Sequence, residues 1–452
     1  MEGSAAAQDR EASRKKPTEL MFFFDTEDYT TPRSCDAARD LMELFREEGV
    51  RAHVALVGYL ARQLVAWRRE DMLDALRYHV IGTHTLYHSV HPDICELSDA
   101  EDYGEAYRRV LAQEAEGVGM IRAATGVDRI AFATPPGNSK SYVAMYVYAD
   151  LGIPFYCDTV ACDAAGSDLW YCGARHVEYN FSLEGFLPGG EEADAGRVLD
   201  ELAARERAIV YCHPNMAVFR EFWDGVNYNG GNLAPFGQWK PCAPRAPEET
   251  AAYYSRIRAF LRRVKADGRF RLVTVPELDA ARKPRVKLRR EDMRFLRDRL
   301  RERFAPIDEP SLCLADIFQA TVCLLRGESE FVPGRVKGFL EAPRGIGEPV
   351  ALRSADLRAA AAHIDLQGFL PSEIDVGGRR LGPADFLRAA LDALADGGET
   401  IAVGPGEQLN SLAALPQLQR LRIAGDWIHT PAFEDRYLSD RLRLQAWTLR
   451  RE

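Results

Sequence analysis

The chain has 452 residues, of which 46% are apolar, and a formal net charge of -10 at pH 7. This length and apolar content predict a globular protein of two or three domains and exclude a disordered or fibrous one. The negative charge argues against nucleic acid as a partner, because phosphate binding needs concentrated Lys and Arg. We interpret the basic cluster at residues 282–290 as a solvated linker between domains.

The sequence offers no targeting or membrane segment. Residues 1–16 are polar and small, and no apolar run reaches the roughly 18 residues that a membrane-spanning helix needs. The nine cysteines show neither a CxxC pair nor a finger-like spacing, which is typical of free thiols in a reducing compartment. We therefore expect a cytoplasmic protein without a membrane span, with residues 1–17 as a disordered tail.

Between residues 18 and 284 the sequence alternates predicted strands and helices. Short apolar runs bounded by polar residues predict the strands, and helical apolar spacing with capping signals predicts the helices. The predicted strands are residues 19–24, 52–58, 79–82, 129–133, 154–157, 208–212 and 271–274. The predicted helices are residues 35–49, 71–78, 98–117, 141–151, 192–205 and 247–268. Such alternation implies an α/β fold with a parallel sheet or barrel.

The first and third predicted strands end in side chains that can bind a metal ion. The acids are Asp25, Glu27 and Asp28, and the imidazoles are His84 and His88. Barrel enzymes carry their catalytic groups at such strand ends. Two imidazoles four residues apart can turn to one face of a helical turn, and a carboxylate from another strand completes a set of three ligands with open positions. The sequence therefore predicts the metal site of a hydrolase.

These segments and three later ones resemble the polysaccharide deacetylases of carbohydrate esterase family 4. The matching segments are Phe24–Glu27, His84–His88, Ala133–Gly137, residues 158–163 and Ile209–Pro214. The His-Thr-Leu-Tyr-His segment is the specific motif, and the others gain weight from their order and spacing. The resemblance covers roughly residues 18–284 and implies a distorted (β/α) barrel of about seven strands.

The resemblance implies a role for five side chains. It makes Asp25 the general base, His213 the general acid, and Glu27, His84 and His88 the ligands of a divalent metal, with zinc as the leading candidate. Such a metal polarises an amide carbonyl and lowers the pKa of a bound water, while the base and acid move the protons. The expected reaction removes an acyl group, N-acetyl first, from a carbohydrate or another small acylated substrate.

The chain departs from the family pattern around the expected base. Asp28 is a rival to Glu27 as the acidic ligand, because several acids share one turn. Ala133 stands where the family has the arginine that orients the aspartate, so Asp25 needs another cation to hold its pKa down.

The third motif and the aromatic loop after His213 supply the expected substrate contacts. Pro136 occupies the position whose N–H usually helps to hold the oxyanion, and proline has no N–H. Gly137 or Asn138 could serve instead. The candidate substrate-binding residues are Pro135, Gly137, Asn138, Trp223 and Tyr228. The loop could form a lid or sugar-stacking wall, or be a packed surface loop that buries its own aromatics.

Residues 285–452 are predicted to form a mainly helical domain with an internal repeat of about 64 to 69 residues. Asp292-Met-Arg, Ile307-Asp308 and Ala315–Ala320 recur in order as Asp356-Leu-Arg, Ile374-Asp375 and Ala384–Ala389. The second copy faintly resembles the pseudomurein-binding repeat, which implies a cell-wall polymer as partner. A structural or homo-oligomerising appendage is the alternative.

Two other functions remain open. A metal-free hydrolase of cyclic amides or ureides, like the allantoinase-like relatives of this fold, would fit the cytoplasmic expectation and the altered third motif, but the metal-binding acid and histidines are present. A catalytically silent carbohydrate-binding protein would fit Ala133, Pro136 and the repeat, but Asp25 and His213 are present. Metal analysis distinguishes the metal-free hydrolase from the leading hypothesis. A turnover measurement distinguishes the silent binding protein from it.

Overall fold

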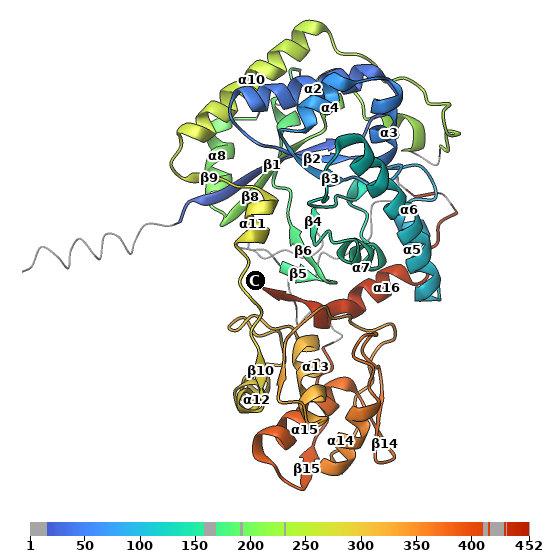
Figure 1. Cartoon of the computed structure of the whole chain (residues 1–452), viewed down its shortest axis with the longest axis vertical. Coiled ribbons are helices and arrows are strands. Elements are labelled where there is room, and N and C mark those ends of the chain that lie inside the picture. Colours follow the sequence, from blue (N-terminus) through green and yellow to red (C-terminus); the bar gives the residue numbers. More distant parts are fainter. Residues whose placement is uncertain are drawn as a thin grey trace, which may run out of the picture.

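The computed structural model describes residues 16–157, 169–189, 193–229, 232–409, 415, 429–430 and 432–451. An α/β unit occupies the upper part of Figure 1, and a smaller, largely helical unit lies below it. The fourth predicted motif, residues 158–163, lies outside the described residues. No described helix has the length and apolarity needed to cross a bilayer.

The α/β unit is built on a parallel sheet whose central strand is β1. In order, its strands are β7 (Phe181–Ser182), β8 (Arg207–Cys212), β1 (Thr18–Thr26), β2 (His53–Leu56) and β3 (Val80–Thr83). β9 (Phe270–Leu272) pairs with residues 18–20 of β1, a part of β1 that β2 does not reach. The sheet continues through Ala133, which bridges Thr83 and Tyr156 in parallel.

Beyond Ala133 follow β4 (Phe155–Cys157) and, parallel to it, β6 (Ala174–Val177). β5 (Leu169–Tyr171) pairs antiparallel with β6, and β16 (Arg450–Arg451) pairs antiparallel with β5. These two strands form the edge of the sheet on this side. Within the described residues no pairing joins β6 to β7, so the barrel is open there. The predicted α/β fold with a distorted parallel barrel is confirmed.

Alternate side chains of β1 face the barrel interior and the surrounding helices. Met21 and Phe23 belong to an interior apolar cluster, in which Phe23 meets the ring of Phe132 at 4.9 Å between centroids. Phe22 and Phe24 point the other way and pack edge-on against Phe45 at 5.2 and 4.8 Å. Because strand side chains alternate, the residue that follows Met21 and Phe23 on the interior side is Asp25.

Helices pack around the sheet. They are α2 (Pro32–Glu47), α3 (Gly58–Ala66), α4 (Glu70–Leu76), α5 (Ile94–Ser98), α6 (Tyr103–Thr125), α7 (Tyr142–Asp150), α8 (Ala195–Ala203), α9 (Trp223–Tyr228), α10 (Pro247–Ala266) and α11 (Val275–Ala280). The helix predicted at residues 98–117 is wrong at both ends, because α6 begins at Tyr103 and continues to Thr125. Asp102 caps the start of α6, and α5, which Asp93 caps, already ends at Ser98.

The predicted strand 129–133 reduces to a single bridging residue, Ala133. Its neighbours still bond to the sheet: the backbone N–H of Ala131 donates to the carbonyl of Ile81 at 2.9 Å, and that of Thr134 to the carbonyl of Thr83 at 2.9 Å. A Cβ placed on Gly82 of β3 would lie 2.4 Å from the ring of Phe132. The glycine thus makes room for an aromatic ring that fills the barrel interior.

The lower unit contains two copies of one arrangement. In each copy an outer pair of antiparallel strands encloses two helices, and the helices are joined through an antiparallel contact. The first copy comprises β10 (Leu288–Arg289), α12 (Met293–Glu302), the Ile307–Leu312 bridge, α13 (Leu314–Leu325) and β11 (Glu330–Phe331). The second comprises β12 (Val350–Arg353), α14 (Ser354–His363), β13 (Ile374–Val376), β14 (Arg379–Leu381), α15 (Pro383–Asp396) and β15 (Thr400–Val403).

The C-terminal segment returns to the α/β unit. α16 (Leu438–Arg443) lies beside α7, and β16 pairs with β5, so the chain ends on the sheet of the first unit (Figure 1). Tyr146 of α7 donates a hydrogen bond to the side-chain oxygen of Gln445 at 2.7 Å, and Tyr171 donates one to the carbonyl of Leu442. The last described residues are therefore part of the α/β unit's surface.

Candidate active site

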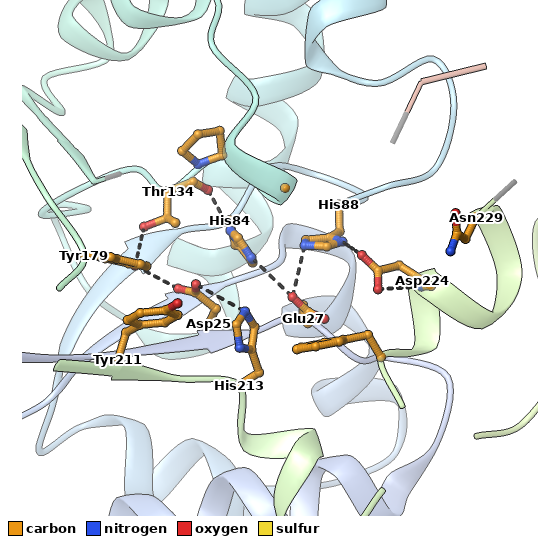
Figure 2. Close-up of a pocket in the computed structure, with 14 residues that line it drawn as sticks. Asp25, Glu27, His84, His88, Thr134, Tyr179, Tyr211, His213, Asp224 and Asn229 are labelled. Atoms are coloured by element: carbon orange, nitrogen blue, oxygen red, sulfur yellow. Dashed lines mark hydrogen bonds and ion pairs between the residues drawn. The ribbon is translucent and has the colours of Figure 1, made fainter. Parts of the chain in front are cut away.

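A cavity of about 550 Å³ opens where the parallel strands end (Figure 2). The predicted catalytic and metal-binding side chains all line it: Asp25, Glu27, His84, His88 and His213. The other lining residues come from connections between the strands and helices: Thr134, Pro135, Gly137, Tyr179, Tyr211, Phe222, Asp224, Gly225 and Asn229. The fold thus brings together residues as far apart in the sequence as Asp25 and Asn229.

Glu27, His84 and His88 converge in a buried cluster. Oε2 of Glu27 lies 3.6 Å from Nε2 of His84 and 3.1 Å from Nε2 of His88. Their ligand atoms lie close enough to share one ion. Oε1 of Glu27 is buried without a hydrogen-bond partner, although a buried carboxylate oxygen normally has one. The three side chains therefore fit a divalent metal with nitrogen and oxygen ligands.

The other nitrogen of each imidazole has its own partner. Nδ1 of His84 lies 2.7 Å from the carbonyl of Thr134 (Figure 2). Nδ1 of His88 lies 2.7 Å from the hydroxyl of Ser89. Ser89 also donates to Asp224 at 3.0 Å. The contact to a carbonyl requires a proton on Nδ1 of His84, which leaves its Nε2 as the free lone pair facing Glu27.

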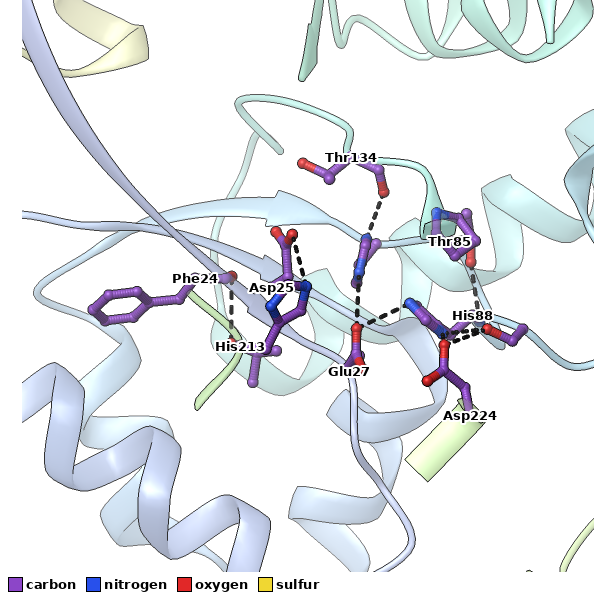
Figure 3. A network of polar contacts seen from close by, with 12 residues as sticks. Phe24, Asp25, Glu27, Thr85, His88, Thr134, His213 and Asp224 are labelled. Atoms are coloured by element: carbon purple, nitrogen blue, oxygen red, sulfur yellow. Dashed lines mark hydrogen bonds and ion pairs between the residues drawn. The ribbon is translucent and has the colours of Figure 1, made fainter. Parts of the chain in front are cut away.

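The His84–His88 segment is not helical, contrary to the prediction. It is an irregular connection after β3, in which Thr85 and His88 have φ angles of 64° and 58°. The backbone N–H of His88 donates to the hydroxyl of Thr85 at 3.0 Å (Figure 3). Left-handed backbone at two non-glycine residues costs conformational energy, and such residues cluster at functional sites. The imidazoles converge through this turn.

Asp28, the rival ligand, faces away from the cluster. It accepts hydrogen bonds from the backbone and hydroxyl of Thr30 at 2.8 and 2.6 Å, and from the hydroxyl of Ser34. It does not line the cavity. Between the two acids, the geometry favours Glu27 as the metal ligand.

Asp25 has a tyrosine partner in place of the expected cation. The hydroxyl of Tyr179 donates to Oδ1 of Asp25 at 2.9 Å, and Nε2 of His213 lies 3.7 Å from Oδ2. No arginine or lysine in the described part of the chain contacts Asp25. Burial raises the pKa of Asp25, and the neighbouring histidines and the Tyr179 hydrogen bond oppose that rise. The carboxylate is therefore more basic than a solvated aspartate.

His213 lies between two acids at the end of β8. Its backbone N–H donates to Oε1 of Glu184 at 2.6 Å, and its Nδ1 lies 3.3 Å from the same oxygen. Burial alone would lower the pKa of His213, but Glu184, Glu27 and Asp25 raise it to about 10. The imidazole is thus positively charged at neutral pH, with Nε2 directed at Asp25 (Figure 2).

The predicted substrate contacts are divided by the structure. Pro135 and Gly137 line the cavity, and the side chain of Asn138 lies outside the described residues. Trp223 and Tyr228 do not line it: both are buried behind the wall, where Trp223 packs against the His88 ring at 5.9 Å. Their neighbours Phe222, Asp224 and Asn229 face the cavity instead.

Tyr179, Glu184 and Asp224 are site residues that the sequence did not indicate. Each lies on an irregular segment or short helix without a recognisable motif. Of the three, only Asp224 could have been suspected from the sequence, because it is an acid inside the aromatic loop that follows His213.

No protein-family model and no curated protein match the chain. Among solved structures, it is similar to a family 4 carbohydrate esterase from Streptomyces lividans in complex with acetate, with 14% identity and a TM-score of 0.31 over 57% of this chain and 94% of that one. It is also similar to a family 4 pseudoenzyme from Bacillus anthracis, with 15% identity and a TM-score of 0.29 over 44% and 56%.

A third similar structure is the 4-alpha-glucanotransferase of Thermococcus litoralis, with 11% identity and a TM-score of 0.41; the match covers 60% of this chain but only 41% of that one. Since all three TM-scores lie below 0.5, neither an activity nor a family follows from these similarities. The functional argument therefore depends on the geometry of the site.

Proposed function

We propose that the protein is a metal-dependent hydrolase that removes an acyl group, N-acetyl first, from a carbohydrate or amino-sugar substrate. The observation that supports it is the convergence of Glu27, His84 and His88 on one side of a cavity whose other side carries Asp25 and His213. A metal-binding cluster beside a separate carboxylate and imidazole is the set of groups that hydrolysis of an amide or ester needs.

In this proposal Glu27, His84 and His88 hold the ion, with zinc as the leading candidate. When bound, the ion supplies Lewis-acid polarisation of the acyl carbonyl and lowers the pKa of water. Asp25 accepts the proton of the attacking water, a role suited to a carboxylate whose pKa is raised by burial. Tyr179 holds Asp25 in place through its 2.9 Å hydrogen bond.

His213 supplies the proton that the leaving nitrogen or oxygen needs. With its pKa raised to about 10, it is protonated at neutral pH before the reaction begins. Glu184 fixes the ring through Nδ1, so the Nε2 proton points into the cavity. Base and acid thus approach the scissile bond from neighbouring strands, β1 and β8.

The test is metal analysis combined with turnover of acetylated amino-sugar oligomers. Protein purified without chelator should contain metal, and His84→Ala or His88→Ala should lose the ion and the activity together. Asp25→Asn and His213→Ala should keep that ion while kcat falls by roughly 10²-fold or more. The exposed His363→Ala is the matched control and should resemble the unmutated protein.

A metal-free wild type that still hydrolyses amides would contradict the metal-dependent mechanism and favour the allantoinase-like alternative. A metal-bound but inactive protein would favour carbohydrate binding without catalysis.

For the repeats of the lower unit we propose a cell-wall polymer or a second copy of the chain as partner. A cytoplasmic location would then require a soluble or precursor-stage substrate.

A further inference from the structure

A second cavity, of about 350 Å³, lies next to α11 at the edge of the sheet where β5 and β16 pair (Figure 1). It shares no described lining residue with the candidate active site, and its wall includes the linker after α11 and residues 333–336 of the lower unit. The charged residues of the described lining are Arg129, Asp279, Arg282, Arg285, Arg335 and Arg450. Part of the basic segment 282–290 thus lines a cavity that is rich in guanidinium groups.

Three of these arginines have a carboxylate partner. The pairs are Arg129 with Asp279 at 2.9 Å, Arg285 with Asp316 at 2.6 Å, and Arg335 with Asp150. A guanidinium carries five N–H donors, so an ion pair through one nitrogen leaves others for a ligand. Arg285 makes its ion pair through Nη2, and its Nη1 and Nε make no hydrogen bond within the described residues.

Arg450 of β16 is a buried cation, with only 7% of its surface exposed. Among the described residues it forms no ion pair, and its one hydrogen bond runs from Nη1 to the carbonyl of Arg451 at 3.3 Å. Burial, the charge of Arg285 and then that of Arg282 lower the pKa of Arg450 to about 10, and Asp316 only partly opposes this. Burying a charge without a counter-charge is costly, so an anion beside Arg450 would stabilise the structure.

Trp170 of β5 holds two of the guanidinium groups at one aromatic ring. The guanidinium carbon of Arg282 lies 4.3 Å from the ring centre, and that of Arg450 lies 4.4 Å from it. The negative face of an indole attracts cations, which offsets part of the repulsion between them. Planar groups held in this way keep a fixed orientation, which bidentate recognition of an anion requires.

We propose that this cavity binds a small organic molecule through its phosphate group, which Arg282, Arg285 and Arg450 hold. A phosphate group carries a charge of roughly -1.5 to -2 at pH 7 and three acceptor oxygens, so it can accept from several guanidinium groups at once. A carboxylate has two oxygens and a single charge. The volume of about 350 Å³ lies within the roughly 300–1,000 Å³ typical of small-molecule sites. The organic part would lie against the apolar lining residues Pro154, Pro333 and Val336.

The bound molecule would connect three parts of the chain. The lining comes from the α/β unit with its C-terminal strand, from the linker, and from residues 333–336 of the lower unit. A ligand that binds only this folded arrangement stabilises it by mass action. It would also cover Arg282 and Arg285, two of the residues after which trypsin can cleave the linker.

The test is calorimetric titration of the full chain with glucose 1-phosphate, ADP and inorganic phosphate, at about 0.15 M salt to screen distant charges. The organic phosphates should bind more tightly than inorganic phosphate, and the tighter of the two identifies a sugar or a nucleotide ligand. Arg450→Ala and Arg282→Ala should each weaken binding by roughly 10-fold or more. The exposed Lys283→Ala, in the same linker but outside the lining, is the matched control and should keep the affinity. Because Arg282 is exposed, its variant keeps the test decisive if Arg450→Ala does not fold.

His84→Ala separates this site from the proposed metal site and should bind the phosphates as the unmutated protein does. Binding that disappears in His84→Ala would place the phosphate in the catalytic cavity and overturn the proposal. So would the absence of binding by all three compounds, or an equal loss of affinity in Lys283→Ala. In the unmutated protein the tighter ligand should also slow trypsin cleavage after Arg282 and Arg285, and unchanged cleavage would contradict the assigned contacts.

Discussion

The contact between Tyr179 and Asp25 is the residue-scale feature that replaces an ion pair. A neutral hydroxyl stabilises a carboxylate less than a guanidinium does, but hydrogen bonds to a charged group still contribute roughly 1.5–3 kcal/mol. The 2.9 Å bond favours the ionised form of Asp25, so it opposes the rise in pKa that burial causes.

Tyr179→Phe should therefore raise the pKa of Asp25 and move the acidic limb of the kcat/KM profile to higher pH. The sign follows because the variant loses a bond made to the ionised form, and the ionised form is the base. The measurement is the pH dependence of turnover in metal-loaded protein. Tyr228→Phe, whose hydroxyl accepts from Trp239 at 3.0 Å behind the wall, is the matched control.

An unchanged acidic limb in Tyr179→Phe would show that Asp25 is held by other groups. A fall in turnover with equal loss of metal would instead indicate that Tyr179 supports the metal cluster.

How far these residues could be predicted depends on their position relative to a strand. Four site residues could be predicted, because each follows an apolar run and parallel strands place their carboxyl ends at one edge of the sheet. They are Asp25, Glu27, His84 and His213. Tyr179, by contrast, comes from a connection without a pattern and reaches Asp25 across 154 residues. Only the folded chain establishes such a contact.

At the scale of elements, the helix pair α6 and α7 buries an ionisable group. Glu114 of α6 is fully buried and accepts a hydrogen bond from the hydroxyl of Tyr148 of α7 at 2.7 Å. Burial raises the pKa of Glu114 to about 7, and the Tyr148 bond only partly opposes the rise. The folded protein thus holds this proton more tightly than the unfolded chain, in which an ordinary value near 4.5 applies.

The sign of the effect on stability follows by linkage. The contribution of Glu114 is most favourable below pH 4.5, declines as pH rises to about 7, and then stays constant, with a total loss of about 3 kcal/mol. Glu114→Gln keeps an acceptor for Tyr148 but cannot ionise, so it should remove this decline and stabilise the protein at pH 8. Urea unfolding at pH 5 and pH 8 measures both effects.

The exposed Glu116→Gln, on the same helix, is the matched control and should keep the pH dependence of the unmutated protein. If Glu114→Gln loses stability equally at both pH values, the carboxylate of Glu114 is satisfied by contacts other than that with Tyr148, and burial is not the governing cause.

Some helices and turns could be predicted from the sequence, and others could not. Long helices such as α2 and α10 follow from apolar periodicity with proline at their starts, because both signals are local. The turn between His84 and His88 does not follow from local signals, since histidines spaced four residues apart suit a helix equally well. Its conformation depends on contacts with Thr134 and Glu27, which lie far away in the sequence.

For the whole molecule, the boundary predicted near residue 284 stays a proposal about function. Every side chain proposed for catalysis lies at or before His213, and the described lining of the cavity ends at Asn229. Yet the chain beyond 285 is not independent of the first unit. Asp99 accepts from the backbone N–H groups of Arg436, Tyr437 and Leu438, and β16 adds a strand beside β5.

Limited trypsin cleavage of the full chain tests this arrangement. Residues 281–287 are basic and mostly exposed and lie outside regular structure, apart from a turn at Ala281, so cleavage should occur there first. The two fragments should nevertheless elute together on gel filtration and keep the Glu27 site and turnover, because the return of the C-terminal segment holds them. Fragments that separate without denaturant would contradict the packing of α16 and β16. Fragments that stay together but lose the metal ion would show that an intact linker, and with it the lower unit, helps to complete the active site.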